Sequence, residues 1–270
     1  MAEDPNNALT ASVEHLGRAT VEVIEEFGYY FLLFFESAYW LLFGAFQKQP
    51  VRLPSVFGQM MTIGIAAIPI IFILSFTIGV MLAIQGIHTL KTFGAEEQVV
   101  VGIALSVMRE FGPLITAIVV AGRSGSALAA RIGTMQVSQE IDALRVMSIN
   151  PVRYLASPVL AAMLLMVPAL AFLSDLAGLL GGAVFTNLEL GLSYSAYVDR
   201  ALEALEADDV MQGLIKAMVF GIIITVIGIS NGFEVKGGAE GVGKATTRSV
   251  VLSISYIVIA DMLFTYFLNR

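Results

Sequence analysis

The sequence predicts an all-α, polytopic membrane protein, and the reasons are its composition and the distribution of its apolar residues. Of the 270 residues, 57% are hydrophobic and only 14% are charged, whereas charged residues make up about a quarter of an average soluble domain. Five apolar runs contain no Asp, Glu, Lys, Arg or His: 60–84, 114–121, 159–173, 217–229 and 250–260. A helix needs about 20 mostly apolar residues to cross the ~30 Å hydrocarbon core of a bilayer, so these runs indicate membrane-spanning helices.

Cysteine and histidine are too scarce for several kinds of functional site. The chain has no cysteine, which excludes disulfides, thiol chemistry and cysteine-ligated metals. Its two histidines, His15 and His88, are far apart in the sequence, so we expect neither a metal site nor a cofactor. The net charge of −7 gives no indication of a nucleic-acid partner. The acidic start "MAEDPNN" differs from the basic start of a secretory signal.

Residues 1–48 are predicted to form an N-terminal region, separate from a transmembrane domain of residues 49–270. Five apolar side chains and one threonine recur within residues 8–27 at spacings of three and four: Leu9, Val13, Leu16, Thr20, Val23 and Phe27. This pattern predicts an amphipathic helix that lies in the membrane interface or packs on a partner. Residues 28–46 are long enough to span the membrane, but Glu36 and many aromatic residues leave open whether they cross it or only dip into it.

Five spans are predicted in the transmembrane domain: 60–86, 98–122, 155–185, 211–232 and 250–268. The third is too long for a straight crossing perpendicular to the membrane. We therefore expect it to tilt or to break at Pro168.

The loops between the spans alternate in positive charge, which predicts the side of the membrane on which each lies. Loops 47–59, 123–154 and 233–249 contain two, four and three Lys or Arg residues, whereas 87–97 and 186–210 contain one each. Cytoplasmic loops carry the excess of positive charge, so we expect the first three in the cytoplasm. The C-terminus is then outside, and the side of the N-terminus stays open.

The sequence "GRSG" at 122–125 matches the Gly-x-Ser-Gly of rhomboid intramembrane proteases. That chemistry needs a base within hydrogen-bond reach of the serine, and the base is normally a histidine from a later helix. No histidine follows residue 88, so we do not expect a catalytic serine here.

The sequence "GAEGVGKAT" at 238–246 nearly matches a phosphate-binding P-loop, but Ala245 stands where the motif needs Ser or Thr. A P-loop also joins a strand to a helix, whereas this segment joins two predicted spans. We interpret it as a flexible, glycine-rich cytoplasmic loop.

Small residues recur at every fourth position before the polar part of the 123–154 loop: Ala121, Gly125, Ala129 and Gly133. This spacing makes a flat helix surface that lets another helix approach closely. We therefore interpret Ser124 and Ser126, which lie among them, as packing residues.

Residues 134–147 are predicted to form a short helix in the cytoplasm, ending near Asn150-Pro151. Ile141, Leu144 and Met147 form its apolar side, while Glu140 and Asp142 project into water or toward a partner. Such a helix between two spans can transmit force from a soluble motor, and it can equally be a solvated loop helix without a partner.

Arg109 and Glu110 are charged residues inside the second predicted span, about 18 Å along it at ~1.5 Å per residue. A charge near the bilayer centre costs at least about 2.5–3.5 kcal/mol. Adjacent residues point about 100° apart on a helix, so each of the two needs its own partner, water or a lipid headgroup. Gly112-Pro113 follows, and the proline frees the carbonyl of Arg109, which predicts a bend.

Three further charged residues lie inside predicted spans: Asp175, Lys216 and Asp261. Lys216 lies near the outer end of its span, so its side chain could extend to the membrane interface. We expect Asp175 and Asp261 to act as structural partners rather than in function.

Several segments together resemble one protein family. They are "REFGPLITAIVVAGRSGSALAARIGTMQVSQEIDAL", "PVRYLASPVLA", "LIKAMVFGIIITVI" and "NGFEVKGGAEGVGKATTRSVV". With them, residues 50–268 resemble the MlaE (YrbE) permeases of lipid-transporting ABC systems. The resemblance implies a homodimeric, non-catalytic permease bound to two ATPase subunits in the bacterial inner membrane. It also implies a periplasmic MCE-domain lipid carrier as partner and phospholipid as substrate, in the lipid trafficking that maintains outer-membrane asymmetry.

The same resemblance assigns roles to individual residues. It implies that 134–147 is the coupling helix on the ATPase, with five contact residues: Gln139, Glu140, Ile141, Asp142 and Arg145. Arg109, Glu110 and Lys216 match positions that line or border the lipid cavity. Residues 28–46 match a segment that is embedded in the membrane without fully crossing it.

Two other functions compete with the permease. A stand-alone secondary transporter or channel would use Arg109 and Glu110 for ion coupling, but such transporters commonly contain an internal repeat, and we find none in this sequence. An intramembrane hydrolase would need the serine chemistry that the scarcity of histidine makes improbable. A tightly bound ATPase would distinguish the permease from both.

Overall fold

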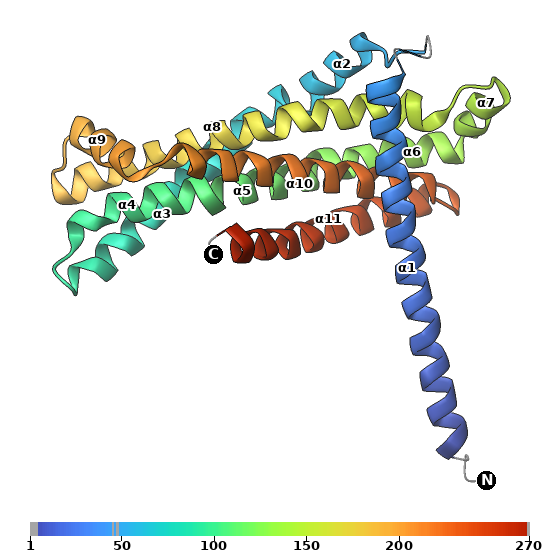
Figure 1. Ribbon diagram of the computed structural model, residues 1–270, viewed down its shortest axis with the longest axis horizontal. Helices are drawn as coiled ribbons and strands as arrows, with labels where there is room; N and C mark the ends of the chain where they lie inside the picture. The colour runs from blue at the N-terminus through green and yellow to red at the C-terminus, as the bar shows by residue number, and fades with distance from the viewer. Residues whose placement is uncertain (1–4, 45, 47–48, 269–270) are drawn as a thin grey trace.

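The computed structural model describes residues 5–44, 46 and 49–268, and every regular element in this part of the chain is a helix (Figure 1). Five continuous helical stretches within it are long and apolar enough to cross a membrane: Leu53–Lys91, Glu96–Val137, Val152–Leu190, Ala207–Phe233 and Gly238–Leu268. Each contains one of the five predicted spans. The prediction of an all-α polytopic membrane protein is therefore confirmed.

The first three stretches are each built from several elements. The first consists of α2 (Leu53–Ile63), η1 (Ile65–Ala67) and α3 (Ile68–Lys91). The second consists of η2 (Glu96–Gln98), α4 (Val99–Ser106), η3 (Val107–Phe111), α5 (Gly112–Val120), η4 (Ala121–Gly125) and α6 (Ser126–Val137). The third consists of η5 (Val152–Ala156) and α8 (Ser157–Leu190). The others are α10 (Ala207–Phe233) and α11 (Gly238–Leu268), and two short helices complete the domain, α7 (Glu140–Val146) and α9 (Tyr194–Ala204).

The N-terminal helix α1 (Pro5–Phe43) is continuous, so the expected boundary between residues 27 and 28 does not appear as a break in the helix. It crosses the bundle and extends beyond it (Figure 1). Tyr30, Leu33 and Ser37 are buried at spacings of three and four, which shows that the second half of α1 packs on the bundle. Four side chains of the proposed amphipathic face lie outside those that the structure describes: Leu9, Val13, Leu16 and Val23.

Two sequence-based expectations about the helix boundaries are wrong, and one of the two alternatives for the third span is excluded. The second span does not end at residue 122 but continues to Val137; its 42 residues correspond to roughly 63 Å, about twice the membrane core. The third span does not break at Pro168, which lies inside the continuous helix α8. Residues 238–246 are not a flexible loop, because α11 begins at Gly238. The chain turns into α11 at Gly237 and Gly238, whose φ angles are positive (87° and 71°), a conformation that glycine adopts readily.

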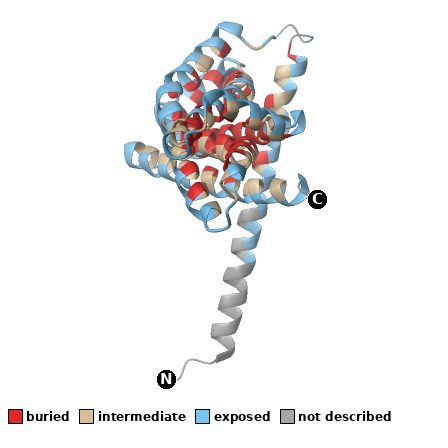
Figure 2. Ribbon diagram, turned by 90° about the vertical axis from the view of Figure 1, so that its left-hand side faces the viewer, coloured by how far each residue is buried: buried red, intermediate tan, exposed pale blue. Residues whose placement is uncertain are grey.

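Close backbone contacts between glycine positions hold α3 against α8. A Cβ atom on Gly79 would lie 1.9 Å from the carbonyl oxygen of Gly178, and one on Gly181 would lie 2.1 Å from that of Phe76. Buried residues gather in the middle of the bundle, while its outer surface is exposed (Figure 2). That surface carries large apolar side chains such as Ile73 and Leu180, which suit contact with lipid.

The helices alternate in direction, so the connections gather at two ends of the bundle (Figure 1). One end, the α7 end, collects the segment before α2, helix α7 and the α10–α11 turn. The other, the α9 end, collects helix α9 and the α3–α4 connection. Where the structure describes them, the three segments that are rich in Lys and Arg therefore lie toward the same end, and the two that are poor in them lie toward the opposite end.

Candidate functional site

Arg109 and Glu110 lie in the π-helical turn η3, where the sequence predicted a bend. Pro113 has no N–H to donate to the carbonyl of Arg109. The backbone instead forms a wider turn, in which the N–H of Gly112 donates to the carbonyl of Val107. Single π-helical turns inside α-helices are frequent at functional sites. This one aims two charged side chains in different directions from the middle of a membrane helix.

Arg109 forms an ion pair with Asp209 in the first turn of α10. The Nε atom donates to Oδ1 of Asp209 at 2.6 Å, and Nη2 lies 2.5 Å from the same oxygen. The other oxygen of Asp209 accepts from the backbone N–H of Glu206, which completes a capping box at the start of α10. Asp209 falls within the predicted loop 186–210, but the structure places it in the first turn of α10 with only 3% of its side chain exposed. The sequence signal for this position is that Asp209 stands three residues after Glu206, the N-cap of α10, as in a capping box.

Lys216 lies at the centre of a second charged cluster, which joins η3, α10 and α11. Its Nζ atom donates to Oε2 of Glu110 at 2.6 Å and lies 3.1 Å from Oδ1 of Asp261. The hydroxyl of Thr265 lies 3.1 Å from Nζ and 3.0 Å from Oε1 of Glu110. The side chain of Lys216 is 2% exposed, so it does not extend to the membrane interface. We call Glu110, Lys216, Asp261 and Thr265 the lysine cluster.

Asp175 and Asp261 were both expected to be structural partners, but their surroundings in the structure differ. It is 2% exposed, and its Oδ1 atom has no hydrogen-bond partner within the part of the chain that the structure describes. It packs against Gly112, where a Cβ atom would lie 1.7 Å from Oδ1. Asp261 is an ion-pair partner of Lys216, whereas Asp175 is a buried polar group beside the π-helical turn.

The four small residues at every fourth position are all buried: Ala121, Gly125, Ala129 and Gly133. A Cβ atom on Gly125 would lie 3.1 Å from Cγ2 of Ile224 in α10, and one on Gly133 would lie 2.7 Å from Cγ2 of Val235. The second span therefore closely approaches α10 and Val235, which follows α10 in the chain.

The expected coupling helix is shorter than predicted. Residues 134–137 belong to α6, the chain turns at Ser138 and Gln139 with Gln139 at φ 61°, and only Glu140–Val146 form α7. Two of its apolar side chains, Ile141 and Leu144, are buried. Met147, which was assigned to the same side, is 60% exposed, because the helix ends before it.

The polar residues of this region are available to a partner. Gln139, Glu140, Asp142 and Arg145 are exposed, and Arg145 donates to Asp142 at 2.9 Å. Beyond α7, Asn150 donates to Glu36 of α1 at 2.8 Å, which links the exit of α7 to the N-terminal helix. Helix α7 lies at the α7 end of the bundle (Figure 1), and its charged side chains are exposed while Ile141 and Leu144 are buried.

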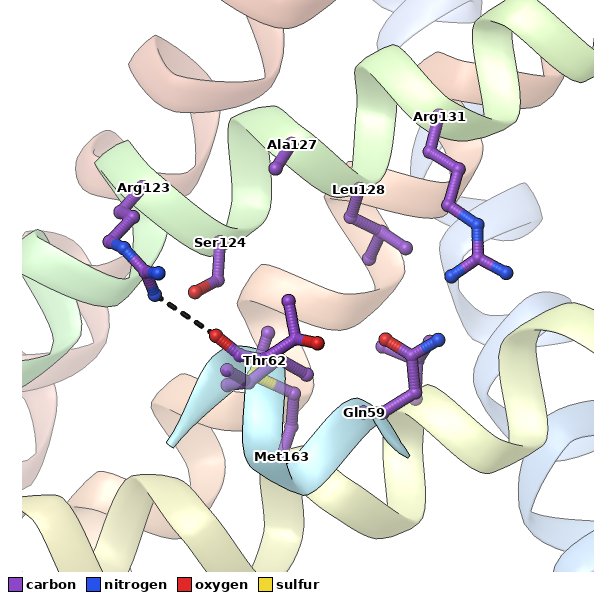
Figure 3. A pocket seen from close by; sticks show the side chains of 10 residues that line it. Gln59, Thr62, Arg123, Ser124, Ala127, Leu128, Arg131 and Met163 are labelled. Carbon is purple, nitrogen blue, oxygen red and sulfur yellow. Dashed lines mark hydrogen bonds between the residues drawn. The ribbon is translucent and has the colours of Figure 1, made fainter. Parts of the chain in front are cut away.

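A cavity of about 310 Å³ lies between α2, the η4–α6 part of the second span, and α8 (Figure 3). Its ten lining residues are Gln59, Thr62, Ile63, Arg123, Ser124, Ala127, Leu128, Arg131, Val159 and Met163. None of these is a His, Lys, Asp or Glu that could act as the base for Ser124. The hydroxyl of Ser124 is buried and has no hydrogen-bond partner among the described residues. The cavity thus combines two guanidinium groups with an apolar wall.

Comparison with known proteins shows similarity over almost the whole chain. Residues 56–267 match the family described as Permease MlaE. A probable ABC transporter permease of Rickettsia prowazekii is 35% identical over 94% of this chain and 96% of its own. The intermembrane phospholipid transport system permease protein MlaE of Haemophilus influenzae is 31% identical over 94% of this chain and 95% of its own. The chloroplastic protein TRIGALACTOSYLDIACYLGLYCEROL 1 of Arabidopsis thaliana is 38% identical over 82% of this chain and 63% of its own.

Proposed function

The chain belongs to the MlaE permease family, and from this premise we propose that it is the membrane subunit of an ABC transporter that moves phospholipids. The observation that carries the proposal is the match to the Haemophilus influenzae permease, whose name specifies intermembrane phospholipid transport. An integral membrane chain with charged clusters inside its spans suits a substrate that has a polar headgroup and apolar tails. The resemblance further supports transport between the bacterial inner membrane and a periplasmic MCE-domain carrier, in the service of outer-membrane lipid asymmetry.

ATP hydrolysis takes place in a separate subunit under this proposal, and α7 transmits its force. The exposed side chains of Glu140 and Asp142 are available to an ATPase, while Ile141 and Leu144 fasten the helix to the bundle. Gln139 and Arg145 complete the coupling surface. Two copies of the chain form the permease, with the α7 end in the cytoplasm and the C-terminus in the periplasm.

Arg109 and Glu110 are the residues that we propose to face the lipid, with Lys216 behind them. The side chain of Arg109 is 36% exposed and that of Glu110 is 29% exposed, whereas Lys216 is 2% exposed. Lys216 therefore acts by holding Glu110 in place rather than by contacting the headgroup. Residues 1–48 form the membrane-interface region of the permease, and residues 49–270 form its transport domain.

A reconstitution experiment tests the proposal. The chain is co-expressed with an ATPase and an MCE-domain protein from the same organism, and the purified complex is placed in vesicles with fluorescent phospholipid. We expect ATP-dependent transfer of lipid between the vesicles and the MCE-domain protein. Transport that needs an ion gradient and no ATPase would instead support the stand-alone secondary transporter.

A further inference from the structure

The cavity between α2, α6 and α8 has features of a binding site that the lipid-facing role of Arg109 and Glu110 does not use. Arg123 lies 14 residues after Arg109 in the same helical stretch, about 21 Å farther along it, toward the α7 end. Arg123 and Arg131 both line the cavity, and neither forms an ion pair with any residue that the structure describes. Both side chains are exposed, so their guanidinium groups are accessible to an anionic partner.

The donors of the cavity are only partly used. Arg123 gives one hydrogen bond, from Nη1 to the carbonyl of Thr62 at 3.0 Å, out of the five N–H donors of a guanidinium group. The carbonyl belongs to the last turn of α2, where backbone oxygens lack partners within the helix. Arg131 and Gln59 point toward each other from opposite sides of the cavity, and the hydroxyl of Ser124 points into it (Figure 3).

The buried hydroxyl of Ser124 is an independent sign of a ligand. Ser124 is only 7% exposed, and its oxygen has no hydrogen-bond partner in the described part of the chain. A buried polar group without a partner is unfavourable, so such a group in a native cavity calls for an explanation. A ligand atom that accepts from the hydroxyl would supply one.

The remaining wall of the cavity is mainly apolar, and its large side chains are buried inside the bundle. Ile63, Leu128 and Val159 line it beside Met163 of α8. A smaller cavity of about 70 Å³ shares Gln59 and Arg131 with it and adds Arg52, a third guanidinium group. Arg123 and Arg131 are eight residues apart, about 12 Å along the helical stretch, so two long side chains can reach one anionic headgroup held between them, beside the apolar wall.

We propose that this cavity binds the phosphodiester of a phospholipid, with Arg123 and Arg131 on the phosphate oxygens and the acyl chains along the apolar wall. Guanidinium groups pair with phosphate through two parallel hydrogen bonds, which suits this placement. The proposal rests on the proposed function and adds a second lipid site, at the end of the bundle opposite to the Arg109–Asp209 ion pair. Because the α7 end is proposed to face the ATPase, a lipid bound here belongs to the leaflet on that side of the membrane. The site would then bind lipid as it enters or leaves the permease.

Photocrosslinking on the full-length chain in detergent tests this site directly. The probe is phosphatidylglycerol with a photoactivatable diazirine in one acyl chain, and crosslinked peptides are identified by mass spectrometry. We expect crosslinks on the peptides that contain Ile63 and Met163. Excess phosphatidylglycerol should abolish them, whereas diacylglycerol with the same chains and millimolar inorganic phosphate should not.

Two variants and one control connect the crosslinks to the cavity. Replacement of both arginines, Arg123→Gln with Arg131→Gln, should weaken competition by phosphatidylglycerol about tenfold or more, because charge-assisted hydrogen bonds are lost. Ala127→Leu should block the cavity without removing charge, and it serves if the double variant does not fold. The control Arg200→Gln removes one positive charge at the opposite end and should leave the crosslinks unchanged.

Competition by inorganic phosphate and by diacylglycerol distinguishes the lipid-phosphate site from two simpler kinds of site. If inorganic phosphate competes as well as phosphatidylglycerol, the cavity is a simple anion site; if diacylglycerol does, it is only an apolar groove. Either result overturns the lipid-phosphate site. ATP-dependent lipid transfer and crosslinking are also measured on the same chain assembled with the ATPase and the MCE-domain protein in vesicles. Transfer without crosslinks at these peptides removes the second site alone, whereas an assembled complex with neither crosslinks nor transfer removes the phospholipid function as well.

Discussion

Lys216 and Glu110 form an ion pair of 2.6 Å between Nζ and Oε2, which ties α10 to the π-helical turn of the second span. Asp261 of α11 adds a second carboxylate at 3.1 Å from the same ammonium group. The lysine cluster therefore places two carboxylates around one buried cation. Removal of Lys216 leaves two carboxylates close together without a counter-charge, whereas removal of one carboxylate leaves Lys216 paired with the other. The two changes should therefore affect stability differently.

We predict that Lys216→Met destabilises the protein more than Glu110→Gln. Without the ammonium group, Glu110 and Asp261 remain close together in the membrane, and an uncompensated buried charge costs about 3–5 kcal/mol, less where it reaches solvent, as Glu110 does. In Glu110→Gln, Lys216 keeps Asp261 and Thr265. Thermal unfolding in detergent, followed by circular dichroism, measures both variants. Equal loss in the two would contradict the central role of the lysine.

Glu110 itself is predicted to support transport rather than folding. Lys216 retains a counter-charge when Glu110 is removed, so Glu110→Gln and Glu110→Ala should both reach the membrane in normal amounts and bind the ATPase. Lipid transfer should fall in both, because the partly exposed carboxylate faces the proposed lipid path. Glu203→Gln, on an exposed position of α9, serves as control. Normal transfer in both variants, or loss of membrane abundance in both, would refute this role.

Hydropathy was sufficient to predict the five spans, because each membrane helix must contain its own apolar run regardless of its neighbours. The partners of the charged residues could not be predicted in this way. Asp209 lies 100 residues from Arg109, and its surroundings in the sequence are acidic and polar, so it resembled a loop residue. Only the helix packing brings it to the π-helical turn, and packing is not encoded in local composition.

Helix ends were predicted least well, for a related reason. Residues 123–137 contain two arginines and several small polar residues, so the hydropathy fell at 122 although the helix continues to Val137. Arg123 and Arg131 also line the cavity shown in Figure 3. This cavity was not predicted from the sequence, because Ser124 was interpreted as a packing residue. Small residues predict close packing on the face toward α10, but they say nothing of what the adjacent face encloses.

Charge reversal on α7 tests the coupling role. Glu140→Lys with Asp142→Lys should leave the chain in the membrane, because both side chains are exposed and the buried contacts of Ile141 and Leu144 remain. Recovery of the ATPase on purification and ATP hydrolysis should both fall severalfold. Glu203→Lys applies the same change to an exposed carboxylate at the opposite end of the bundle. If the double variant retains full ATPase recovery and hydrolysis, α7 is not the coupling helix.

The absence of cysteine from the chain allows a clean test of the proposed orientation. Single cysteines replace Lys91 and Lys244, which are both exposed and lie near opposite ends of the bundle. In intact cells, a membrane-impermeant maleimide should label Lys91→Cys after opening of the outer membrane, and Lys244→Cys only after lysis. Labelling of both from the same side would contradict the alternation of the spans.

The last prediction concerns the contact between α3 and α8, on which the membrane domain depends. A Cβ atom on Gly79 would lie 1.9 Å from the backbone oxygen of Gly178, and no side-chain rotation can relieve this clash, because neither atom moves when a side chain rotates. Gly79→Ala should therefore force the two helices apart and cost about 1–3 kcal/mol or more, seen as a lower unfolding temperature in detergent. Gly102→Ala is the matched control, because Gly102 is also helical but a Cβ atom there would meet no other atom within 4 Å. Gly102→Ala should raise the free energy of unfolding by up to about 1 kcal/mol, because alanine has a higher helix propensity than glycine. A tolerated Gly79→Ala would mean that α3 and α8 are held by side chains elsewhere and not by this close approach of their backbones.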